Sequence, residues 1–292
     1  MLEHRYRTGP HARTRGDFWS WYDRVLAATL KTGLKIAGQY TRGVANALNP
    51  EIRHVQVEFT GLPRGLEGYR ILHLSDLHID GMDGLAEVLA GLLPSLPVDL
   101  CVLTGDYRYQ VYGPCDAVYP RMRRVVQAVR SRHGVVGILG NHDCAEIAVE
   151  LERAGVRMLI NEAVGIGSPD SRLWVIGVDD PYYYDCAELS DALAEVPEGA
   201  FRLLLAHTPD MYDEAAGAGI DLYLTGHTHA GQIRLPLLGP LVVHSACPRP
   251  YTSGHWIHSG MRGYTSSGVG CSLLPVRFGC RPEIAVIELR GA

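Results

Sequence analysis

Short apolar runs alternate with amphipathic stretches along the chain between residues 69 and 225. Apolar runs of four to eight residues are typical of buried strands, whereas apolar positions three and four apart are typical of helices. The apolar runs predict strands over residues 69–75, 98–104, 134–139, 157–160, 173–178, 201–206 and 220–225. The amphipathic stretches predict helices over residues 85–93, 116–132, 145–154, 189–195 and 209–216. Alternating strands and helices with short connections indicate a layered α/β architecture.

Strand-like patterns also flank this alternating region. Residues 54–59 alternate apolar and polar positions and predict a strand. After Gln232 the chain becomes a series of short strands and turns that ends with a predicted strand over residues 284–289. This strand-rich part indicates a second sheet. We therefore expect an α/β domain over residues 51–292.

The first 50 residues have a different pattern. Residues 1–16 are polar and basic and predict a disordered tail, whereas residues 17–48 predict an amphipathic helix that ends before Asn49-Pro50. Its apolar positions near helical spacing are Phe18, Trp19, Trp21, Tyr22, Val25, Leu26, Leu30, Leu34 and Ile36. Aromatic and basic residues together suit a helix that lies in a membrane interface. The alternative is a helix packed on the protein's own body.

Charge narrows the class of partner. The chain has 292 residues, of which 47% are hydrophobic, and its formal net charge of −5 gives no reason to expect nucleic acid binding. Residues 1–50 carry eight Lys or Arg against three Asp or Glu, whereas the remainder carries 19 against 29. This asymmetry predicts an anionic partner for the first segment, and a membrane surface bound through residues 17–48 would be one.

Cysteine usage and hydropathy predict the compartment. Seven cysteines without a C-x-x-C pair favour reduced thiols over a disulfide framework or a zinc knuckle. No run approaches the roughly 18 apolar residues of a membrane span, and the N-terminus does not resemble a signal peptide. We therefore expect a cytoplasmic protein that is peripheral on the cytoplasmic face of the inner membrane.

Five loops that follow predicted strands carry residue types that bind metal ions. They are Ser75-Asp76-Leu77-His78, Gly105-Asp106, Gly140-Asn141-His142-Asp143, His207 and Gly226-His227-Thr228-His229. One Asp or His after a strand is usually a turn residue or a helix cap, but five such loops in order outweigh that interpretation. Carboxylate, amide and imidazole ligands together suit Mn, Fe or Zn better than Ca or Mg alone. Seven candidate ligands exceed one tetrahedral site but suit two divalent ions that share a carboxylate.

The order D-x-H, G-D, G-N-H-D, H, G-H-x-H resembles the calcineurin-like metallophosphoesterases over roughly residues 69–289. The resemblance implies a four-layer α/β/β/α sandwich with a binuclear metal centre at the strand ends. It implies that one ion is held by Asp76, His78, Asp106 and His229. It implies that the second ion is held by Asp106, Asn141, His207 and His227, with Asp106 bridging. It also implies that His142 contacts the phosphate or protonates the leaving group and that Asp143 orients His142.

Other polar residues near the motifs have weaker signals. Arg108, two residues after Asp106, is a candidate phosphate clamp, with a surface salt bridge as the alternative. His73 lies inside a predicted strand, so we expect a packed core histidine. For the histidines of the last part of the chain a structural role is favoured over a substrate role; these are His244, His255 and His258.

The resemblance also narrows the reaction. The residues around Asp106 and Asn141 depart from the motifs G-D-x-V-D-R-G and R-G-N-H-E of phosphoprotein phosphatases. Segments 203–210, 226–233, 263–270 and 274–278 are similar to the small, membrane-associated bacterial branch, in which one type of member cleaves the pyrophosphate of UDP-2,3-diacylglucosamine in lipid A synthesis. We expect a hydrolase of a phosphoester or pyrophosphate, with this lipid precursor as the first candidate. A phosphodiesterase of soluble small diesters or cyclic nucleotides is the alternative, and a non-catalytic scaffold would have lost ligands that are present here.

Overall fold

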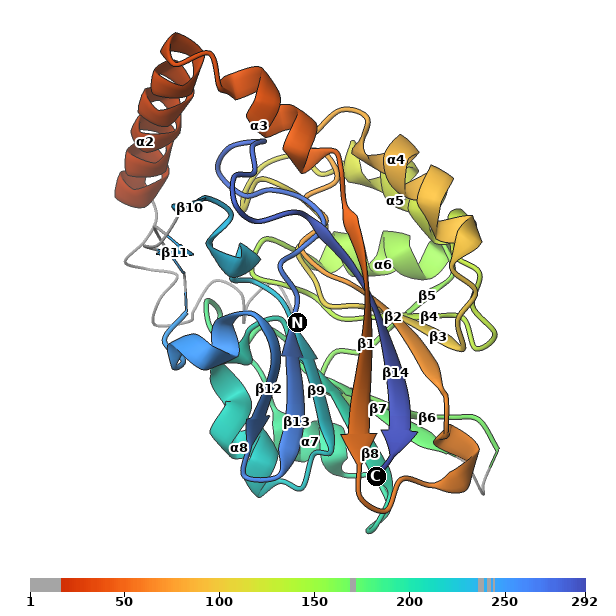
Figure 1. Ribbon diagram of the computed structural model, residues 1–292. Helices are drawn as coiled ribbons and strands as arrows, with labels where there is room; N and C mark the ends of the chain where they lie inside the picture. The colour runs from red at the N-terminus through yellow and green to blue at the C-terminus, as the bar shows by residue number, and fades with distance from the viewer. Residues whose placement is uncertain (1–16, 169–171, 236–238, 241–242, 244) are drawn as a thin grey trace.

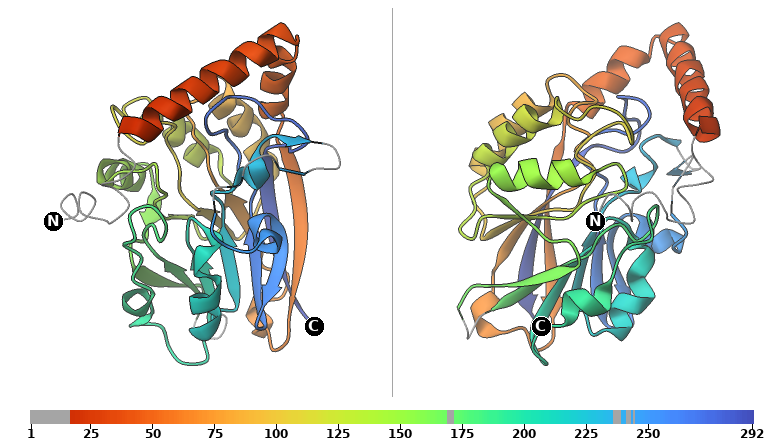
Figure 2. Two further views of the ribbon diagram at one scale, coloured as in Figure 1. Left: turned by 90° about the vertical axis from the view of Figure 1, so that its left-hand side faces the viewer. Right: turned by 180° about the vertical axis from the view of Figure 1, so that it is seen from behind.

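Two six-stranded sheets lie face to face, with helices on the outer side of each (Figures 1 and 2). The structure is a computed structural model that describes residues 17–168, 172–235, 239–240, 243 and 245–292. The four layers confirm the predicted α/β/β/α sandwich. The predicted disordered tail, residues 1–16, lies outside the described residues.

The first sheet has the strand order β1-β14-β2-β3-β4-β5. Its strands are β1 (Glu51–Phe59), β14 (Glu283–Gly291), β2 (Arg70–Leu74), β3 (Leu100–Leu103), β4 (Val135–Gly137) and β5 (Val156–Met158). Strands β2 to β5 are parallel to one another, whereas β14 is antiparallel to β2 and parallel to β1. The strand β14 therefore lies between two strands that come from early in the sequence.

The second sheet has the strand order β12-β13-β9-β8-β7-β6. Its strands are β12 (Gly254–His258), β13 (Met261–Thr265), β9 (Leu222–Thr225), β8 (Phe201–Leu205), β7 (Leu173–Gly177) and β6 (Glu162–Ile166). The four inner strands are parallel, and the two edge strands are antiparallel to their neighbours. A separate hairpin pairs β10 (Arg234–Leu235) with β11 (Gly239–Pro240).

Helices cover the outer face of each sheet. The first sheet is covered by α4 (Leu85–Leu92), α5 (Val118–Ala128) and α6 (Ala145–Arg153), and the second by α7 (Leu189–Leu193) and α8 (Tyr212–Gly217). Short 3-10 helices connect the elements: η1 (Arg64–Leu66), η2 (Leu93–Ser95), η4 (Pro209–Met211), η5 (His229–Gly231) and η6 (Arg249–Thr252).

Three apolar clusters fill the spaces between the layers. The central cluster lies between the two sheets and includes the fully buried Ile71, Val102, Leu203 and Leu224. The outer clusters lie between each sheet and its helices. Because the inner strands are buried on both faces, they are continuous apolar runs in the sequence. This is why the sequence pattern located all of these inner strands except β13 to within two residues at each end.

The N-terminal segment forms two helices, so the prediction of one helix over residues 17–48 is wrong in this respect. Helix α2 (Asp17–Ile36) ends before Gly38, and α3 (Tyr40–Ala47) follows it. Gly38 has a φ of +65°, which glycine adopts without steric cost, and the chain turns here between the two helices (Figure 1). Helix α2 lies at the periphery of the molecule, and α3 packs on the domain (Figure 1).

Helix α3 makes a close contact with the segment before β14. Gly43 is buried, and a Cβ atom at this position would lie 2.8 Å from the ring of Phe278 and 2.8 Å from Cβ of Val276. Glycine therefore allows the helix backbone to lie directly on residues 276–278. Within the described residues, no helix is both long enough and apolar enough to cross a bilayer.

Candidate metal centre

The predicted ligands lie in loops that follow strands of both sheets. Asp76 and His78 follow β2, Asp106 follows β3, Asn141 follows β4, His207 follows β8, and His227 and His229 follow β9. These strands are neighbours within their sheets, and their carboxyl ends meet at one edge of the sandwich. The fold thereby brings together side chains from five separate segments, as the sequence predicted.

Backbone geometry at these loops is unusual. Five of the seven predicted ligands have a positive φ: Asp76 (52°), His78 (38°), Asp106 (58°), His227 (69°) and His229 (48°). Non-glycine residues in this region cost about 1–3 kcal/mol each and persist only where the surroundings enforce them. The fold therefore holds these side chains in place against a local preference of the backbone.

One group of donors consists of Asp76, His78 and His229, and their ligand atoms all lie within 4.8 Å of one another. Nε2 of His229 lies 3.2 Å from Nε2 of His78 and 3.4 Å from Oδ1 of Asp76. All three residues are buried. These are three of the four residues that the family resemblance assigned to the first ion.

The second group consists of Asp106, His207 and His227, again with ligand atoms within 4.8 Å of one another. Oδ2 of Asp106 lies 3.3 Å from Nε2 of His207 and 3.6 Å from Nε2 of His78, which belongs to the first group. Nδ1 of His227 lies 3.3 Å from Nε2 of His207. Asp106 therefore lies between the two groups, in the position that a bridging ligand requires.

The donor atoms fit divalent ions. Oδ1 of Asn141 is buried and accepts no hydrogen bond from any residue that the structure describes. An unsatisfied buried amide oxygen costs about 1–3 kcal/mol, and a bound cation removes this cost. The mixture of carboxylate, amide and imidazole donors suits Mn, Fe or Zn.

The histidine rings are held by their outer nitrogens. Nδ1 of His78 lies 2.8 Å from the carbonyl oxygen of Arg108, and Nδ1 of His207 lies 2.7 Å from that of Thr104. Because a carbonyl oxygen only accepts, Nδ1 carries a proton in each ring, and Nε2 is the nitrogen that faces the carboxylates. Metal-binding histidines are usually held in this way.

Burial and charge act in opposite directions at the centre. Burial favours the uncharged form of Asp106, but His207, His142 and His78 outweigh it and hold the pKa of Asp106 well below its usual value. Burial also disfavours the charged ring of His207, but the attraction of Asp106 raises the pKa of His207 to about 10. At His78 burial dominates and lowers the pKa to about 3. Without a bound ion Asp106 and His207 thus form an ion pair and His78 is neutral. A cation that binds Nε2 of His207 would displace the second proton of that ring, because a ligand ring must be neutral.

The predicted catalytic residue His142 lies beside both groups. Its Nε2 is 3.8 Å from Oδ2 of Asp106, and its side chain is 17% exposed, more than the rings of His78 and His207. Its Nδ1 lies 2.7 Å from the carbonyl oxygen of Tyr109. Nε2 is therefore the nitrogen that faces the centre and the solvent.

The expectation that Asp143 orients His142 needs correction. The carboxylate of Asp143 accepts the backbone N–H groups of Asp106, Gly140 and Tyr107, at 2.7, 2.9 and 2.9 Å. With the longer contact from the N–H of Arg108, at 3.5 Å, four backbone donors occupy this carboxylate, and the carbonyl of Tyr109 holds the ring of His142 instead. Asp143 thus fixes the loop that carries Asp106.

Arg108 is neither on the surface nor free to clamp a phosphate in this conformation. It is 5% exposed, and its guanidinium donates to the carbonyl oxygens of His142 (2.5 Å), Gly113 (3.1 Å) and Val111. These contacts connect the loop after β3 to the loop that carries His142. Arg108 therefore stabilises the two loops relative to each other.

Other predicted residues lie outside the centre. His73 is fully buried in β2, where Nε2 contacts Oγ1 of Thr104 at 2.9 Å, so the prediction of a core histidine is confirmed. His258 contacts Tyr251 and Asp213, and His255 lies on the exposed side of β12. His244 lies outside the described residues.

Two buried charged residues near the centre were not predicted. Asp180 follows β7 and accepts the backbone N–H groups of Tyr183 and Tyr184, at 2.6 Å each; burial raises its pKa to about 6. Its position after an apolar strand is the same signal that located Asp106. Arg277 is fully buried and contacts His229, and no periodic pattern in the sequence indicates it.

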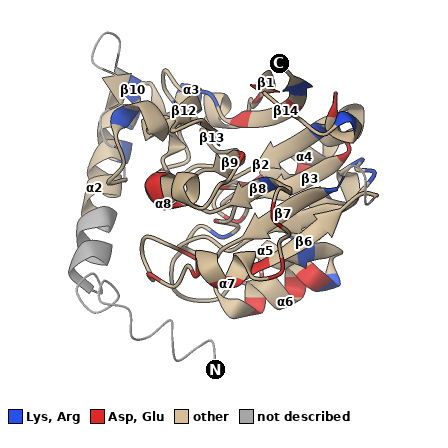
Figure 3. Cartoon of the chain, turned by 90° about the horizontal axis from the view of Figure 1, so that it is seen from below, with Lys and Arg blue, Asp and Glu red and all other residues tan. Residues whose placement is uncertain are grey.

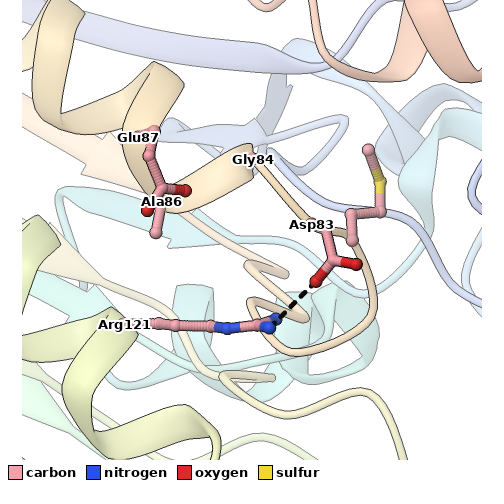
Figure 4. A pocket seen from close by; sticks show the side chains of 6 residues that line it. Asp83, Gly84, Ala86, Glu87 and Arg121 are labelled. Carbon is pink, nitrogen blue, oxygen red and sulfur yellow. Dashed lines mark hydrogen bonds and ion pairs between the residues drawn. The ribbon is translucent and has the colours of Figure 1, made fainter.

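A surface depression elsewhere on the domain includes none of the predicted ligands. Its lining residues are Met82, Asp83, Gly84, Ala86, Glu87 and Arg121 (Figure 4). The ion pair between Arg121 and Asp83, 3.0 Å long, crosses it, and the side chain of Asp83 is 98% exposed. An exposed ion pair of this kind has no apparent catalytic use.

Comparison with known proteins identifies the family. A family model described as calcineurin-like phosphoesterase matches residues 69–231. The Bacillus subtilis protein named uncharacterized metallophosphoesterase YkuE is 28% identical over 281 residues, which cover 91% of this chain and 95% of that protein. The Escherichia coli protein named phosphodiesterase YaeI is 31% identical over 231 residues, which cover 76% and 82%.

A relative from Bos taurus is named transmembrane protein with metallophosphoesterase domain. It is 28% identical over 299 residues, which cover 92% of this chain and 65% of that protein. The family model, the two bacterial relatives and the paired groups of donors at the strand ends agree with one another. The chain belongs to the calcineurin-like phosphoesterases and is a metal-dependent hydrolase of phosphoester bonds with a binuclear divalent metal centre.

Proposed function

We propose that the chain hydrolyses a phosphodiester or pyrophosphate bond of a substrate presented at a membrane surface. The proposed ligands of the first ion are Asp76, His78, Asp106 and His229, and those of the second are Asp106, Asn141, His207 and His227. The observation that carries this assignment is the position of Asp106, whose Oδ2 lies within 3.6 Å of a histidine from each group.

The residues around the centre have separate tasks in the proposed reaction. Two bound divalent ions neutralise the anionic oxygens of a phosphoester and make a water molecule more acidic. His142 contacts the phosphate or gives a proton to the leaving oxygen from Nε2, because its Nδ1 is held by the carbonyl of Tyr109. Arg108 braces the loop of His142 through the contact with its carbonyl oxygen.

Metal dependence is tested by removing the ions and returning them one at a time. Chelated protein should hydrolyse an aryl phosphodiester at a rate near background, and Mn²⁺ should restore the rate with a stoichiometry of two ions per chain. Full turnover after complete removal of metal would contradict the proposal. Bound metal without turnover on any phosphoester would favour the scaffold alternative.

The substrate class rests on the relatives and on the N-terminal helices. The relative from Escherichia coli is named a phosphodiesterase, which supports a diester or anhydride bond. The bovine relative is named a transmembrane protein, which supports a substrate at a membrane. UDP-2,3-diacylglucosamine, an amphiphile with a pyrophosphate, is the first candidate, and soluble small diesters or cyclic nucleotides are the second.

A turnover panel separates these candidates. The panel contains UDP-2,3-diacylglucosamine in vesicles, a cyclic nucleotide, an aryl diester and an aryl monoester, each with Mn²⁺. A value of kcat/KM for the lipid at least about 100-fold above those of the soluble diesters supports the first candidate. If kcat/KM for the lipid is equal to or lower than the values for the soluble diesters, the favoured substrate becomes a soluble diester.

The chain contains two lysines, Lys31 and Lys35, and both are exposed on α2. Basic positions on this helix are visible at the periphery in Figure 3. A helix on an anionic surface gains about 1 kcal/mol per basic residue near it. We propose that α2 lies on such a surface, with cytoplasmic localisation, and that the boundary of the catalytic domain lies near residue 50.

Vesicle binding tests this attachment. The double variant Lys31→Glu, Lys35→Glu should bind phosphatidylglycerol vesicles at least about tenfold more weakly than the wild type, and vesicles should protect both lysines from acetylation. The control reverses two exposed charges on the other side of the domain, Arg123→Glu and Arg130→Glu. Equal binding by both double variants would refute a role for α2.

A further inference from the structure

We propose that Arg277 is a positioning residue for the ligand His229 and that helix α3 holds Arg277 in place. The inference rests on the proposed metal centre, in which His229 is a ligand of the first ion. It assigns to the N-terminal helices a task beyond attachment, because α3 then supports the geometry of the centre.

The guanidinium of Arg277 is buried without a carboxylate. The side chain is 0% exposed, and its partners among the described residues are carbonyl oxygens, a ring nitrogen and the thiol of Cys280. Nη2 donates to the carbonyl oxygens of Gly268 (3.1 Å) and Gly270 (2.5 Å). Nε has no partner among the described residues. Burial of a guanidinium without an ion-pair partner is unfavourable, and its hydrogen bonds to the carbonyl oxygens of His229, Gly268 and Gly270 offset this cost.

Arg277 holds His229 at two points. Nη1 donates to the carbonyl oxygen of His229 at 3.3 Å, and Nη2 lies 3.2 Å from its Nδ1. Because a guanidinium only donates, Nδ1 accepts in this contact and the proton of the neutral ring lies on Nε2. Binding of an ion at Nε2 would move that proton to Nδ1, and the contact at the carbonyl oxygen would then be the one that remains. The other ring nitrogen, Nε2, then faces Oδ1 of Asp76 at 3.4 Å and Nε2 of His78 at 3.2 Å. The contact at the carbonyl oxygen therefore fixes the backbone from which the ligand ring projects.

His229 needs such support because its backbone is strained. Its φ is 48°, and the next residue, Ala230, has a φ of 47°. Two consecutive non-glycine residues in the left-handed region return to common backbone angles unless neighbours prevent it. The contact between Arg277 and the carbonyl oxygen of His229 acts on this part of the backbone.

Helix α3 holds the backbone of Arg277 from the other side. The backbone N–H of Arg277 donates to the carbonyl oxygen of Gly43 at 3.0 Å, and Nδ2 of Asn46 donates to the carbonyl oxygen of Arg277 at 2.9 Å. The close approach at Gly43 places the helix directly on Phe278 and Val276. A continuous series of contacts thus runs from α3 through Arg277 to the backbone of His229.

Titration with Mn²⁺ tests the inference, with calorimetry and electron paramagnetic resonance as readouts that do not depend on turnover. Arg277→Met and Gly43→Leu should each lower the affinity for one of the two Mn²⁺ ions by about tenfold or more. This is the effect of removing a group that orients a ligand. Arg277→Lys keeps the positive charge but loses the two Nη donors of the guanidinium. Its Mn²⁺ affinity should lie between those of wild type and Arg277→Met. The ¹⁵N resonances of His229 should shift in Arg277→Met.

Gly33→Leu is the matched control for Gly43→Leu. Gly33 lies on α2, where a Cβ atom would meet nothing within 4 Å, so Mn²⁺ affinity should stay within about twofold of wild type. Circular dichroism and thermal unfolding identify variants that do not fold. If Arg277→Met or Gly43→Leu is unfolded, Asn46→Ala replaces it, with an expected loss of about threefold or more in affinity for one ion.

The outcomes separate this inference from the proposed function. A wild type that binds no Mn²⁺ would refute the metal centre itself. A wild type that binds two ions, together with Arg277 and α3 variants that bind both equally well, would overturn only the inference. If the Arg277 variants lose Mn²⁺ affinity but folded Gly43→Leu and Asn46→Ala keep that of the wild type, α3 has no role in positioning His229.

Discussion

The backbone N–H of His227 donates to both carboxylate oxygens of Asp76, at 3.1 and 3.0 Å, although the residues are 151 positions apart. One loop of the second sheet thereby orients a proposed ligand from the first sheet. The residue before His227 is Gly226, and its small size allows this approach. The loop that supplies His227 and His229 is thus also part of the support of Asp76.

Gly226→Val should abolish most activity although it removes no ligand. A Cβ atom at this position would lie 1.8 Å from Oγ of Ser75 and 2.3 Å from Oδ2 of Asp76, so the carboxylate must move. We expect kcat to fall at least about 100-fold, with weaker binding of one ion, since misplacement by about 1 Å costs this much. The control is Gly91→Val in α4, where a Cβ atom meets nothing within 4 Å. Wild-type kcat in Gly226→Val would show that this contact is not needed.

Asn141→Ala should lose the second ion. The variant removes the buried amide oxygen that has no partner among the described residues, and His207→Ala removes another proposed ligand of the same ion. Metal content, measured by mass spectrometry after gel filtration, should fall from two ions to one in each variant. Asn141→Asp keeps an oxygen donor and should retain more metal than Asn141→Ala. Two tightly bound ions in both alanine variants would exclude the assignment.

His142→Asn should lower turnover without loss of metal. The loss of a group that donates a proton to a leaving oxygen typically costs about 10²–10⁴-fold in rate. The loss should be larger for an alkyl ester than for a 4-nitrophenyl ester, whose leaving group needs no proton. The measurement is kcat on both esters, with metal content as the control. An equal loss on both esters would indicate that His142 binds the phosphate and does not protonate the leaving group.

Asp143→Asn should destabilise the loop of Asp106. An amide has one acceptor oxygen, whereas the two carboxylate oxygens of Asp143 accept four backbone N–H groups, so the NH₂ group would face a donor. We expect the free energy of unfolding to fall by about 2–3 kcal/mol. Urea unfolding measures this change in stability. The control is Asp116→Asn, a substitution of an exposed aspartate. Equal stability of the two variants would refute the proposed role of Asp143.

His73 should make the fold sensitive to acid. Burial lowers the pKa of His73 to about 3, from an ordinary value of 6.5. Between these values the unfolded chain binds a proton that the folded chain excludes, so the stability from His73 is present above pH 6.5 and is lost as pH falls. The loss between pH 7 and pH 5 is about 2 kcal/mol. His73→Gln keeps a donor for Thr104 but has no titrating ring. Between pH 7 and pH 5 its free energy of unfolding, measured with urea, should fall by about 2 kcal/mol less than that of the wild type. The same pH dependence in both proteins would contradict this account.

The sequence located most of the strands and the proposed ligands because one physical cause produces both signals. Parallel strands buried on both faces are apolar throughout, and their polar ends therefore stand out, as Asp106 does after β3. The same logic failed where burial is partial. Strand β6 is half-exposed along most of its length, and β12 alternates, so neither was identified by its residues.

Contacts between distant segments could not be predicted from the pattern. Asp143 was assigned to the ring of His142, its neighbour in sequence, but the fold places backbone N–H groups of residues 106 and 107 closer to its carboxylate. Arg277 was quoted only as part of a family-like ending, because a buried cation without periodic neighbours has no local signature. The break between α2 and α3 at Gly38 was also missed, since one glycine in a helical pattern is often tolerated.

The position of β14 between β1 and β2 has a consequence for how the protein is made. Every proposed ligand leaves the ribosome before β14, yet β2, which carries the loop of Asp76, has an unpaired edge until β14 inserts. Such open edges can pair with other chains. Nascent chains that stall before residue 283 would therefore expose the unpaired edge of β2, which can pair with strands of other chains. Binding of a chaperone to the growing chain would be most useful during that interval.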